Sequence, residues 1–195
     1  MPSTNWRALG TGSVLGYLRG DLKKAKKEVF IIGPWIDEFF ADQLVLACPK
    51  KLNLKILTRP LEMMSQDFLN HARAAREIFK AYGSAEVRNS PVIHAKTIVI
   101  DESIFYCGSA NWYRYSLEEG QELVLRGSID NVPALLDEIR SIWDQGKSES
   151  LEKITNKGVS VTSQKNGYQE ELLDPIAAKK LKTVPGSFVL GKKRP

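Results

Sequence analysis

The sequence predicts an α/β protein in which helices cover a central β-sheet. Short apolar segments with strand character alternate along the chain with longer segments whose apolar residues recur at helical spacing. The chain has 195 residues, of which 43% are hydrophobic, which is enough for one packed domain with an addition, or for two small ones. The third observation is a central apolar run over residues 92–111, which contains the polar residues of greatest functional interest.

The first quarter of the chain predicts a helix, a strand and a second helix. Residues 13–27 place three leucines on one helical stripe, with four lysines largely off that stripe. Residues 28–32 (EVFII) read as a short buried strand, which Gly33 and Pro34 end. Residues 37–47 suit another helix.

The next segment predicts a strand over residues 52–58 and a long helix. Ser65 can cap this helix, and Gly83 can end it. His71 lies beside the apolar stripe of the helix, where a lone histidine is usually a surface or packing residue. A short strand over residues 85–88 follows.

Two side chains come directly after predicted strands. Trp35 follows the strand over residues 28–32, and Arg59 follows the strand over residues 52–58. Open α/β sheets bind ligands beyond the carboxyl ends of their strands. Trp35 can therefore line a site or pack in the core, and Arg59 can bind a phosphate or lie in solvent.

The central run predicts two strands, over residues 92–100 and 103–107, with a turn at Asp101. Side chains alternate along a strand, so His94 and Lys96 are expected on the same face. Lysine is rarely buried unless it is paired. An anion bound between these two side chains would explain their place at the head of a buried strand.

The chain beyond the run predicts an aromatic loop, a strand and a last helix. In the loop, Trp112 and Arg114 can bind a substrate by stacking and by charge, or the loop can simply pack over the sheet. Residues 121–126 alternate as a strand. Asp130 can cap a helix that ends near Gly146.

From Lys147 onward polar residues dominate and apolar residues become sparse. This change predicts a domain over residues 1–146 and a C-terminal extension over residues 147–195. Residues 1–146 hold 18 basic and 18 acidic side chains, so the net charge of +5 belongs to the extension. We expect this extension to be an arm that packs on a protein partner or a basic tail that contacts nucleic acid.

The polar residues of the run are spaced as H-x-K, four residues, D, six residues, G-S-x-N, and every position is filled. This pattern resembles the signature of the phospholipase D superfamily, and the chain is similar to its small single-motif members, the dimeric Nuc-type endonucleases. The resemblance implies a phospholipase D-like mixed sheet flanked by helices. It assigns catalytic roles to His94, Lys96, Ser109 and Asn111. Gly108 and Asp101 are then structural members of the motif, and Asp101 is expected to hydrogen-bond local backbone groups.

These residue types suit chemistry on a phosphodiester. Lys96 and the Asn111 amide can hold the non-bridging oxygens, and a neutral nitrogen of His94 can attack phosphorus to form a phosphohistidine. A carboxylate on the second ring nitrogen would fix the tautomer. Glu122 is expected to be that carboxylate, because an acidic residue in a similar place orients the histidine in related proteins.

The leaving oxygen needs a proton from a second acid on the far side of phosphorus. The chain has two histidines, and His71 has no lysine or asparagine companion. The second His94 is therefore expected to come from another copy of the chain across a two-fold axis. The resemblance also implies a homodimer.

The first functional hypothesis is a metal-independent nuclease that acts on DNA or RNA. The second is a phospholipase D or phosphatidyltransferase, and the third is a catalytically inactive module that binds nucleic acid or protein. No cofactor is expected, and no metal, because acidic residues are not clustered as Mg²⁺ ligands would be.

The cellular location is expected to be the cytoplasm. No apolar run approaches the roughly 20 residues needed to cross a bilayer, and the amino terminus lacks a signal-peptide pattern. No membrane insertion is therefore expected. Without a secretory signal, Cys48 and Cys107 are expected to be buried and reduced.

Overall fold

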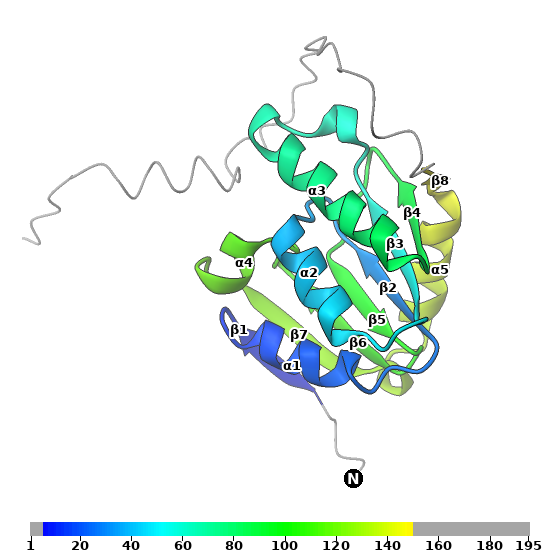
Figure 1. The fold of residues 1–195 in the computed structure, drawn as a ribbon. Helices are drawn as coiled ribbons and strands as arrows, with labels where there is room; N and C mark the ends of the chain where they lie inside the picture. Colours follow the sequence, from blue (N-terminus) through cyan, green and yellow to red (C-terminus); the bar gives the residue numbers. More distant parts are fainter. Residues whose placement is uncertain (1–5, 150–195) are drawn as a thin grey trace, which may run out of the picture. The chain divides into compact units, whose positions relative to one another are not determined.

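Within residues 6–149, the part of the chain that the computed structural model describes, eight strands form one mixed sheet (Figure 1). The strands are β1 (Arg7–Gly10), β2 (Glu28–Ile32), β3 (Asn53–Thr58), β4 (Ala85–Asn89), β5 (Thr97–Ile100), β6 (Ile104–Gly108), β7 (Leu123–Ser128) and β8 (Lys147–Ser148). Across the sheet they lie in the order β1-β7-β6-β5-β2-β3-β4-β8. The pairs β2–β3 and β3–β4 are parallel, and the other neighbouring pairs are antiparallel.

The helices of this part of the chain are α1 (Val14–Leu22), α2 (Glu38–Ala47), α3 (Gln66–Tyr82), α4 (Arg114–Glu118) and α5 (Ala134–Gln145), with short 3-10 helices over Leu61–Met63 and Ile129–Asn131. α2 connects β2 to β3 and α3 connects β3 to β4, because parallel neighbours need a crossover connection. β5 and β6 are antiparallel, so a tight turn is enough to join them.

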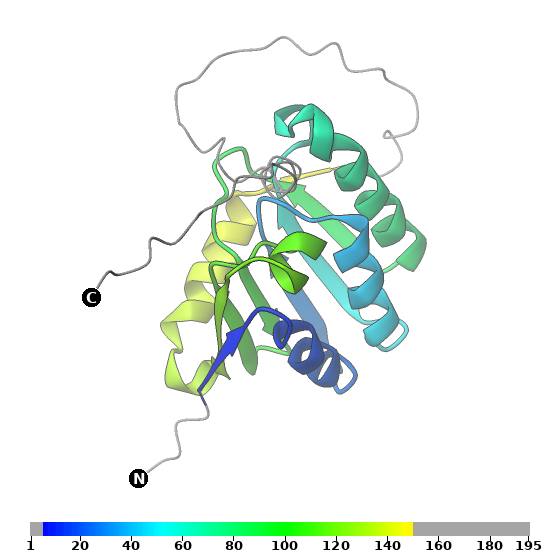
Figure 2. The ribbon, with the colours of Figure 1, turned by 90° about the vertical axis from the view of Figure 1, so that its left-hand side faces the viewer.

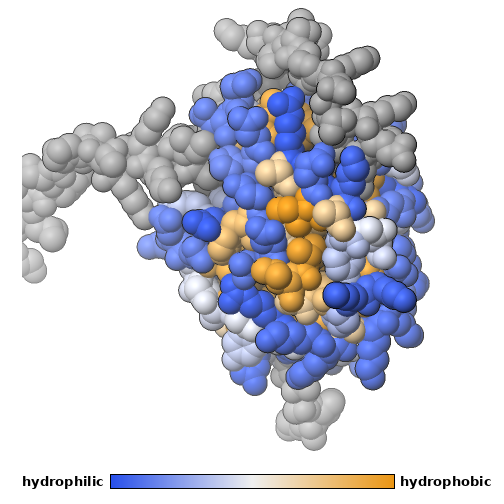
Figure 3. Space-filling view, viewed as in Figure 1, coloured by the Kyte–Doolittle hydropathy of each residue, from blue (hydrophilic) through white to orange (hydrophobic). Residues whose placement is uncertain are grey.

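Helices cover both faces of the sheet (Figure 2). α1, α2 and α3 lie on one face, where Leu18, Phe40 and Phe79 pack with strand residues. α5 lies on the other face, where Ile139 and Trp143 pack with residues of β2, β5 and β6. Figure 3 shows that apolar side chains also gather at the surface over α2, which carries the exposed Leu46.

The predicted α/β fold is confirmed, and several elements lie where the sequence pattern placed them. β2 coincides with the predicted strand, and α2 begins after Asp37, whose side chain accepts a hydrogen bond from the Phe40 N–H (2.8 Å). α3 ends at Gly83, which has the left-handed φ of +83° typical of a C-terminal cap. The extents of these elements follow from local signals, because apolar periodicity and end residues agree in each of them.

Other expectations are wrong in detail. β1, α4 and β8 were not expected, and β5 begins at Thr97 rather than at residue 92. Asp130 does not cap the last helix; it lies in a 3-10 turn, and Pro133 precedes the first residue of α5. Glu122 lies just before β7 rather than inside it.

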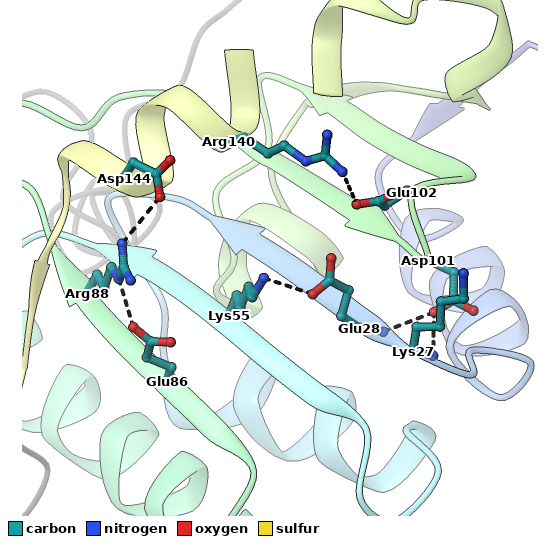
Figure 4. A network of polar contacts seen from close by, with 9 residues as sticks. All are labelled: Lys27, Glu28, Lys55, Glu86, Arg88, Asp101, Glu102, Arg140 and Asp144. Atoms are coloured by element: carbon teal, nitrogen blue, oxygen red, sulfur yellow. Dashed lines mark hydrogen bonds and ion pairs between the residues drawn. The ribbon is translucent and has the colours of Figure 1, made fainter. Parts of the chain in front are cut away.

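The turn between β5 and β6 is fixed by the side chain of Asp101. Its carboxylate accepts hydrogen bonds from the backbone N–H groups of Lys26 (2.7 Å), Lys27 (2.8 Å) and Glu28 (3.1 Å). Figure 4 shows this contact at the edge of a polar network on the sheet, in which Lys55 pairs with Glu28 at 2.8 Å. The expectation of local backbone partners was wrong, because the bonds reach the start of β2, more than 70 residues earlier in the chain.

The last described residues continue the sheet. β8 pairs with the end of β4, and the carboxylate of Glu149 accepts two hydrogen bonds from the buried Arg76 at 2.9 and 3.0 Å. Residues 6–149 all lie in one compact unit. Residues 150–195, and with them the expected role of the extension in binding protein or nucleic acid, lie outside the described residues.

Two further expectations concern the membrane and the cysteines. Among the helices of residues 6–149, none is both long and apolar enough to cross a bilayer. Cys48 and Cys107 are free thiols rather than a disulfide. Cys48 is buried, which raises its pKa to about 12, while Cys107 is half-buried.

Candidate functional site

The residues of the sequence motif meet at one edge of the sheet. β2, β3 and β6 end at this edge, while β5 and β7 begin there. The N–H of Gly108 donates to the carbonyl of Lys96 (3.3 Å), and the N–H of Ser109 donates to the carbonyl of Leu123 (3.1 Å). A side chain at Gly108 would place its Cβ 2.1 Å from the Leu123 carbonyl oxygen, so glycine is required for this close approach.

His94 and Lys96 lie in the segment that leads into β5, not in the strand itself. The Lys96 Nζ lies 3.0 Å from His94 Nε2 and 3.0 Å from the His94 carbonyl oxygen. An ammonium group has no lone pair, so Lys96 donates and His94 Nε2 accepts. In a neutral ring this contact places the ring proton on Nδ1. His94 is exposed, so a large substrate can reach it.

Asn111 lies on the neighbouring segment after β6. Its side chain is buried, and its Oδ1 makes no hydrogen bond to any residue of the described chain. Its backbone N–H donates to the Ser116 Oγ at 2.9 Å. A buried amide oxygen without a partner typically costs about 1–3 kcal/mol, which a substrate or water donor would offset.

Glu122 directs its carboxylate toward two hydroxyl groups. Ser109 Oγ donates to Oε2 and Ser116 Oγ donates to Oε1, each at 2.5 Å. Ser109 therefore contacts Glu122, and the pairing of Glu122 with His94 stays a prediction. Ser116 was not singled out in the sequence, because a serine in an aromatic loop carries no periodic or motif signal.

Trp35 and Arg59 lie beyond β2 and β3 at the same edge of the sheet. The Trp35 ring packs edge-on against Phe68, with ring centroids 5.1 Å apart. The Arg59 guanidinium lies over the Trp35 ring at 5.4 Å, and Arg76 donates to the Arg59 carbonyl at 2.9 Å. Both side chains are half-buried, so they form a fixed aromatic and cationic surface at this edge.

Trp112 does not lie where a substrate base could stack on it. Its ring is completely buried, stacks on Phe40 with centroids 5.4 Å apart, and donates its N–H to the Ile32 carbonyl at 2.8 Å. The expectation that Trp112 binds substrate is wrong, because a ring with no exposed surface cannot contact a ligand. The backbone of Trp112 instead joins the motif loop to Trp35 and Asp37 through two hydrogen bonds of 3.1 and 3.2 Å.

Arg114 is exposed at the start of α4. Its guanidinium lies over the Phe39 ring at 4.5 Å, and its backbone N–H donates to Asp37 Oδ2 at 2.8 Å. Burial raises the pKa of Asp37 above its ordinary value, although the N–H groups of Arg114 and Phe40 act in the opposite direction. The backbone of Arg114 is therefore held by Asp37, while its charged side chain lies at the surface.

His71 lies on α3 and pairs with Glu38 of α2. Its Nδ1 lies 2.8 and 2.9 Å from the two carboxylate oxygens. This contact links α3 to α2 through their side chains. In the part of the chain that the structure describes, no group of three or more His, Cys, Asp and Glu side chains is arranged to hold a metal ion.

The profile of a protein family described as "Cardiolipin synthase, PLD-like domain" matches residues 18–145 of the sequence. The sequence matches no curated protein.

Three solved structures share the fold. Nuc from Salmonella typhimurium, described as a phospholipase D family member, is similar with a TM-score of 0.63 and 15% identity over 75% of this chain and 99% of its own. NucT from Helicobacter pylori has a TM-score of 0.62 and 13% identity over 75% of this chain and 100% of its own. A phosphatidylserine synthase from Haemophilus influenzae has a TM-score of 0.56 and 13% identity over 74% of this chain and 40% of its own.

Proposed function

Because this chain belongs to the phospholipase D superfamily, with its PLD-like domain over residues 18–145, we propose that it is a metal-independent nuclease that hydrolyses phosphodiester bonds of DNA or RNA. The observation that carries the proposal is the contact between Lys96 Nζ and His94 Nε2 at 3.0 Å. In this contact Lys96 can donate to the Nε2 of a neutral His94 ring at an exposed edge of the sheet. Such an arrangement suits nucleophilic attack on an anionic phosphorus centre.

The proposed reaction has two displacements. In the first, His94 Nε2 forms a bond to phosphorus, the bond from phosphorus to the leaving oxygen breaks, and a second histidine gives that oxygen its proton. In the second, the same histidine takes a proton from water as the water oxygen attacks phosphorus, and the bond to Nε2 breaks. Lys96 and Asn111 hold the non-bridging oxygens throughout both steps. Glu122 accepts a hydrogen bond from the Nδ1–H group of the nucleophilic His94.

The second histidine is proposed to be His94 of a second copy of the chain. The other histidine of the sequence, His71, is already paired with Glu38 on α2 and α3. Large apolar side chains next to the motif support a protein interface here, since Val92 is 85% exposed and Leu123 is 57% exposed. Val92 precedes His94 by two residues, and Leu123 directly follows Glu122.

A nucleic acid is the proposed substrate because two arginine side chains near the site pack on aromatic rings and can bind phosphate groups. Arg59 and Arg114 lie over aromatic rings, Arg59 beyond β3 and Arg114 three residues after Asn111, where they can contact phosphates of a bound strand. The net charge of +5 adds attraction to a polyanion. The motif also resembles that of small single-motif nucleases.

The experiment is a substrate panel in the presence of EDTA, with single-stranded and double-stranded DNA, RNA and phospholipid vesicles. We expect cleavage of a nucleic acid that is lost in His94→Ala. The matched control is His71→Ala, which removes the second histidine of the chain and should retain activity. Activity that needs an added divalent metal, or that survives His94→Ala, would contradict the proposal.

A phospholipase D or phosphatidyltransferase is the second candidate function. Two observations favour it: the matching family profile carries the description of a cardiolipin synthase, and Val92 and Leu123 expose apolar surface next to the motif. Turnover of vesicle lipid with no cleavage of nucleic acid would establish this alternative. Tight binding of DNA without turnover of any substrate would instead indicate an inactive binding module.

A further inference from the structure

Ser116 is a buried hydroxyl that connects two parts of the site. It lies in α4 and its side chain has no exposed surface. Its Oγ accepts the Asn111 N–H at 2.9 Å and donates to Glu122 Oε1 at 2.5 Å. An ionised carboxylate can only accept and a backbone N–H can only donate, so the directions of both bonds are fixed.

Ser109 makes the matching contact on the other carboxylate oxygen. Its Oγ donates to Glu122 Oε2 at 2.5 Å and accepts the Leu123 N–H at 3.1 Å. Each serine hydroxyl therefore has a backbone donor that orients it and a carboxylate oxygen to which it donates. A carboxylate oxygen has a further lone pair, so Glu122 can still accept a ring N–H.

Thr11 holds the backbone of the same glutamate. Its Oγ1 accepts the Glu122 N–H at 3.0 Å and donates to the Gly120 carbonyl. Beside it, the Gly12 N–H donates to the Leu117 carbonyl at 3.0 Å. The turn between β1 and α1 thus fixes the segment between α4 and β7, which leaves Glu122 little freedom to turn away from the two serines.

We propose that Ser116 is a positioning residue, which orients the Glu122 carboxylate and the Asn111 backbone and acts on the reaction through them. This proposal rests on the proposed function, in which Glu122 fixes the tautomer of His94 and Asn111 holds the phosphate. Removal of the Ser116 hydroxyl leaves the Asn111 N–H and one Glu122 oxygen without their buried partner. At metal sites, groups that orient a ligand side chain typically contribute about 10- to 100-fold to activity, and we expect an effect of similar size here.

The kinetic test compares Ser116→Ala with Ser116→Thr, which keeps a hydroxyl. We expect Ser116→Ala to lower kcat roughly 10- to 100-fold with KM little changed, and Ser116→Thr to recover part of the loss. Thr58→Val is the matched control, because Thr58 is another buried hydroxyl, which donates to the Pro34 carbonyl at 3.3 Å. If Ser116→Ala does not fold, Ser116→Cys fills the site with a slightly larger group and replaces the hydroxyl by a weak donor.

A double-mutant cycle with Glu122→Gln separates positioning from a general structural effect. If Ser116 acts through Glu122, most of the loss in kcat caused by Ser116→Ala disappears when position 122 is already glutamine. A loss as large in the Glu122→Gln background as in the unaltered protein would overturn the proposal.

A spectroscopic measurement keeps the test independent of turnover. With 15N-labelled histidine, the ring nitrogens of His94 and His71 give a simple spectrum, because the chain has two histidines. We expect Ser116→Ala and Glu122→Gln to change the tautomer balance of His94 and to leave His71 unchanged. An unaltered protein that cleaves nothing would refute the proposed function, while a His94 spectrum unaffected by Ser116→Ala would refute the role of Ser116.

Discussion

The three residues closest to the proposed chemistry differ in how firmly they are held. Lys96 contacts both the ring and the carbonyl of His94, whereas Asn111 is buried and held through its backbone. The His94 ring stays exposed, which a nucleophile needs if it is to meet a long polymer. At the scale of single residues, the site therefore combines an accessible His94 ring with Lys96 and Asn111, which neighbouring groups hold in place.

Asp101 belongs to the same motif but acts at a distance from the chemistry. It has a left-handed φ of +52° and accepts three backbone N–H groups at the start of β2. We expect Asp101→Gly, which tolerates this φ, to lower the free energy of unfolding by about 1–3 kcal/mol through the lost hydrogen bonds. Urea unfolding measures this loss, and kcat per folded molecule should stay close to that of the unaltered protein.

The control for this substitution is the neighbouring Glu102→Gly. Glu102 also has a positive φ, of +54°, but its carboxylate contacts the exposed Arg140. Its removal should change the free energy of unfolding far less. Equal effects of the two substitutions would show that the backbone hydrogen bonds of Asp101 contribute nothing measurable.

At the scale of elements, α1 is fastened to the sheet by one buried cluster. Asp21 of α1 accepts hydrogen bonds from Arg126 of β7 (2.6 and 2.9 Å) and from the Tyr106 hydroxyl of β6 (2.5 Å). Burial alone would raise the pKa of Asp21, but the hydrogen bonds from Arg126 and Tyr106 and the charge of Arg126 hold it below its ordinary value. The cluster joins the α1 end of the domain to two strands that also carry the motif loop.

This cluster predicts a dependence of stability on pH. Because the pKa of Asp21 is lower in the folded state, its contribution is fully present above the ordinary pKa of 3.8 and is lost as the pH falls through the folded-state pKa. Asp21→Asn should lower the free energy of unfolding at pH 7 by about 1–3 kcal/mol. It should also reduce the difference between pH 7 and pH 3, measured by urea unfolding, and an unchanged difference would exclude Asp21 as its source.

The sequence was a good guide to elements with local signals and a poor guide to those that need a partner. β2 could be predicted because EVFII is apolar and ends at a Gly-Pro pair. β1 and β8 could not, because four and two mostly exposed residues become strands only by pairing with β7 and β4. β5 starts at Thr97 because its neighbour β2 ends opposite it at Ile32.

The candidate site shows the same division. The spacing of the motif was enough to single out His94, Lys96 and Asn111, since all three lie within 18 consecutive residues. The contacts of Ser116 with Glu122 depend on how α4 packs under the loop, and a local pattern does not contain that information. The sequence left Trp112 open to substrate binding or to packing, because the same motif neighbour can face a ligand or the core, and its burial in the structure supports packing.

At the scale of the whole molecule, a shared site predicts that subunits depend on one another. If each site needs His94 from two copies, a mixed dimer of unaltered and His94→Ala chains has no complete site. After subunit exchange, activity should fall with the square of the unaltered fraction. Mixing with Asp144→Ala, which alters a highly exposed side chain on α5, is the control for exchange itself. A linear fall would mean that each copy works alone.

The basic extension predicts a second property of the whole molecule. Residues 151–195 hold nine basic and four acidic side chains, and truncation after Ser150 keeps β8 and the contact of Glu149 with Arg76. If the extension contacts nucleic acid, truncation should flatten the dependence of DNA affinity on salt concentration. The measurement is a set of binding titrations between about 50 and 200 mM salt. A slope equal to that of the full chain would remove the extension from the nucleic-acid interface.

The covalent role of His94 is the central claim, and stereochemistry at phosphorus tests it most directly. A substrate with a chiral phosphorothioate at the cleaved position is hydrolysed in isotopically labelled water with EDTA present, and the configuration of the product is determined. Two successive in-line displacements through a phosphohistidine predict retention of configuration. Inversion would mean that water attacks phosphorus directly, and it would contradict the account.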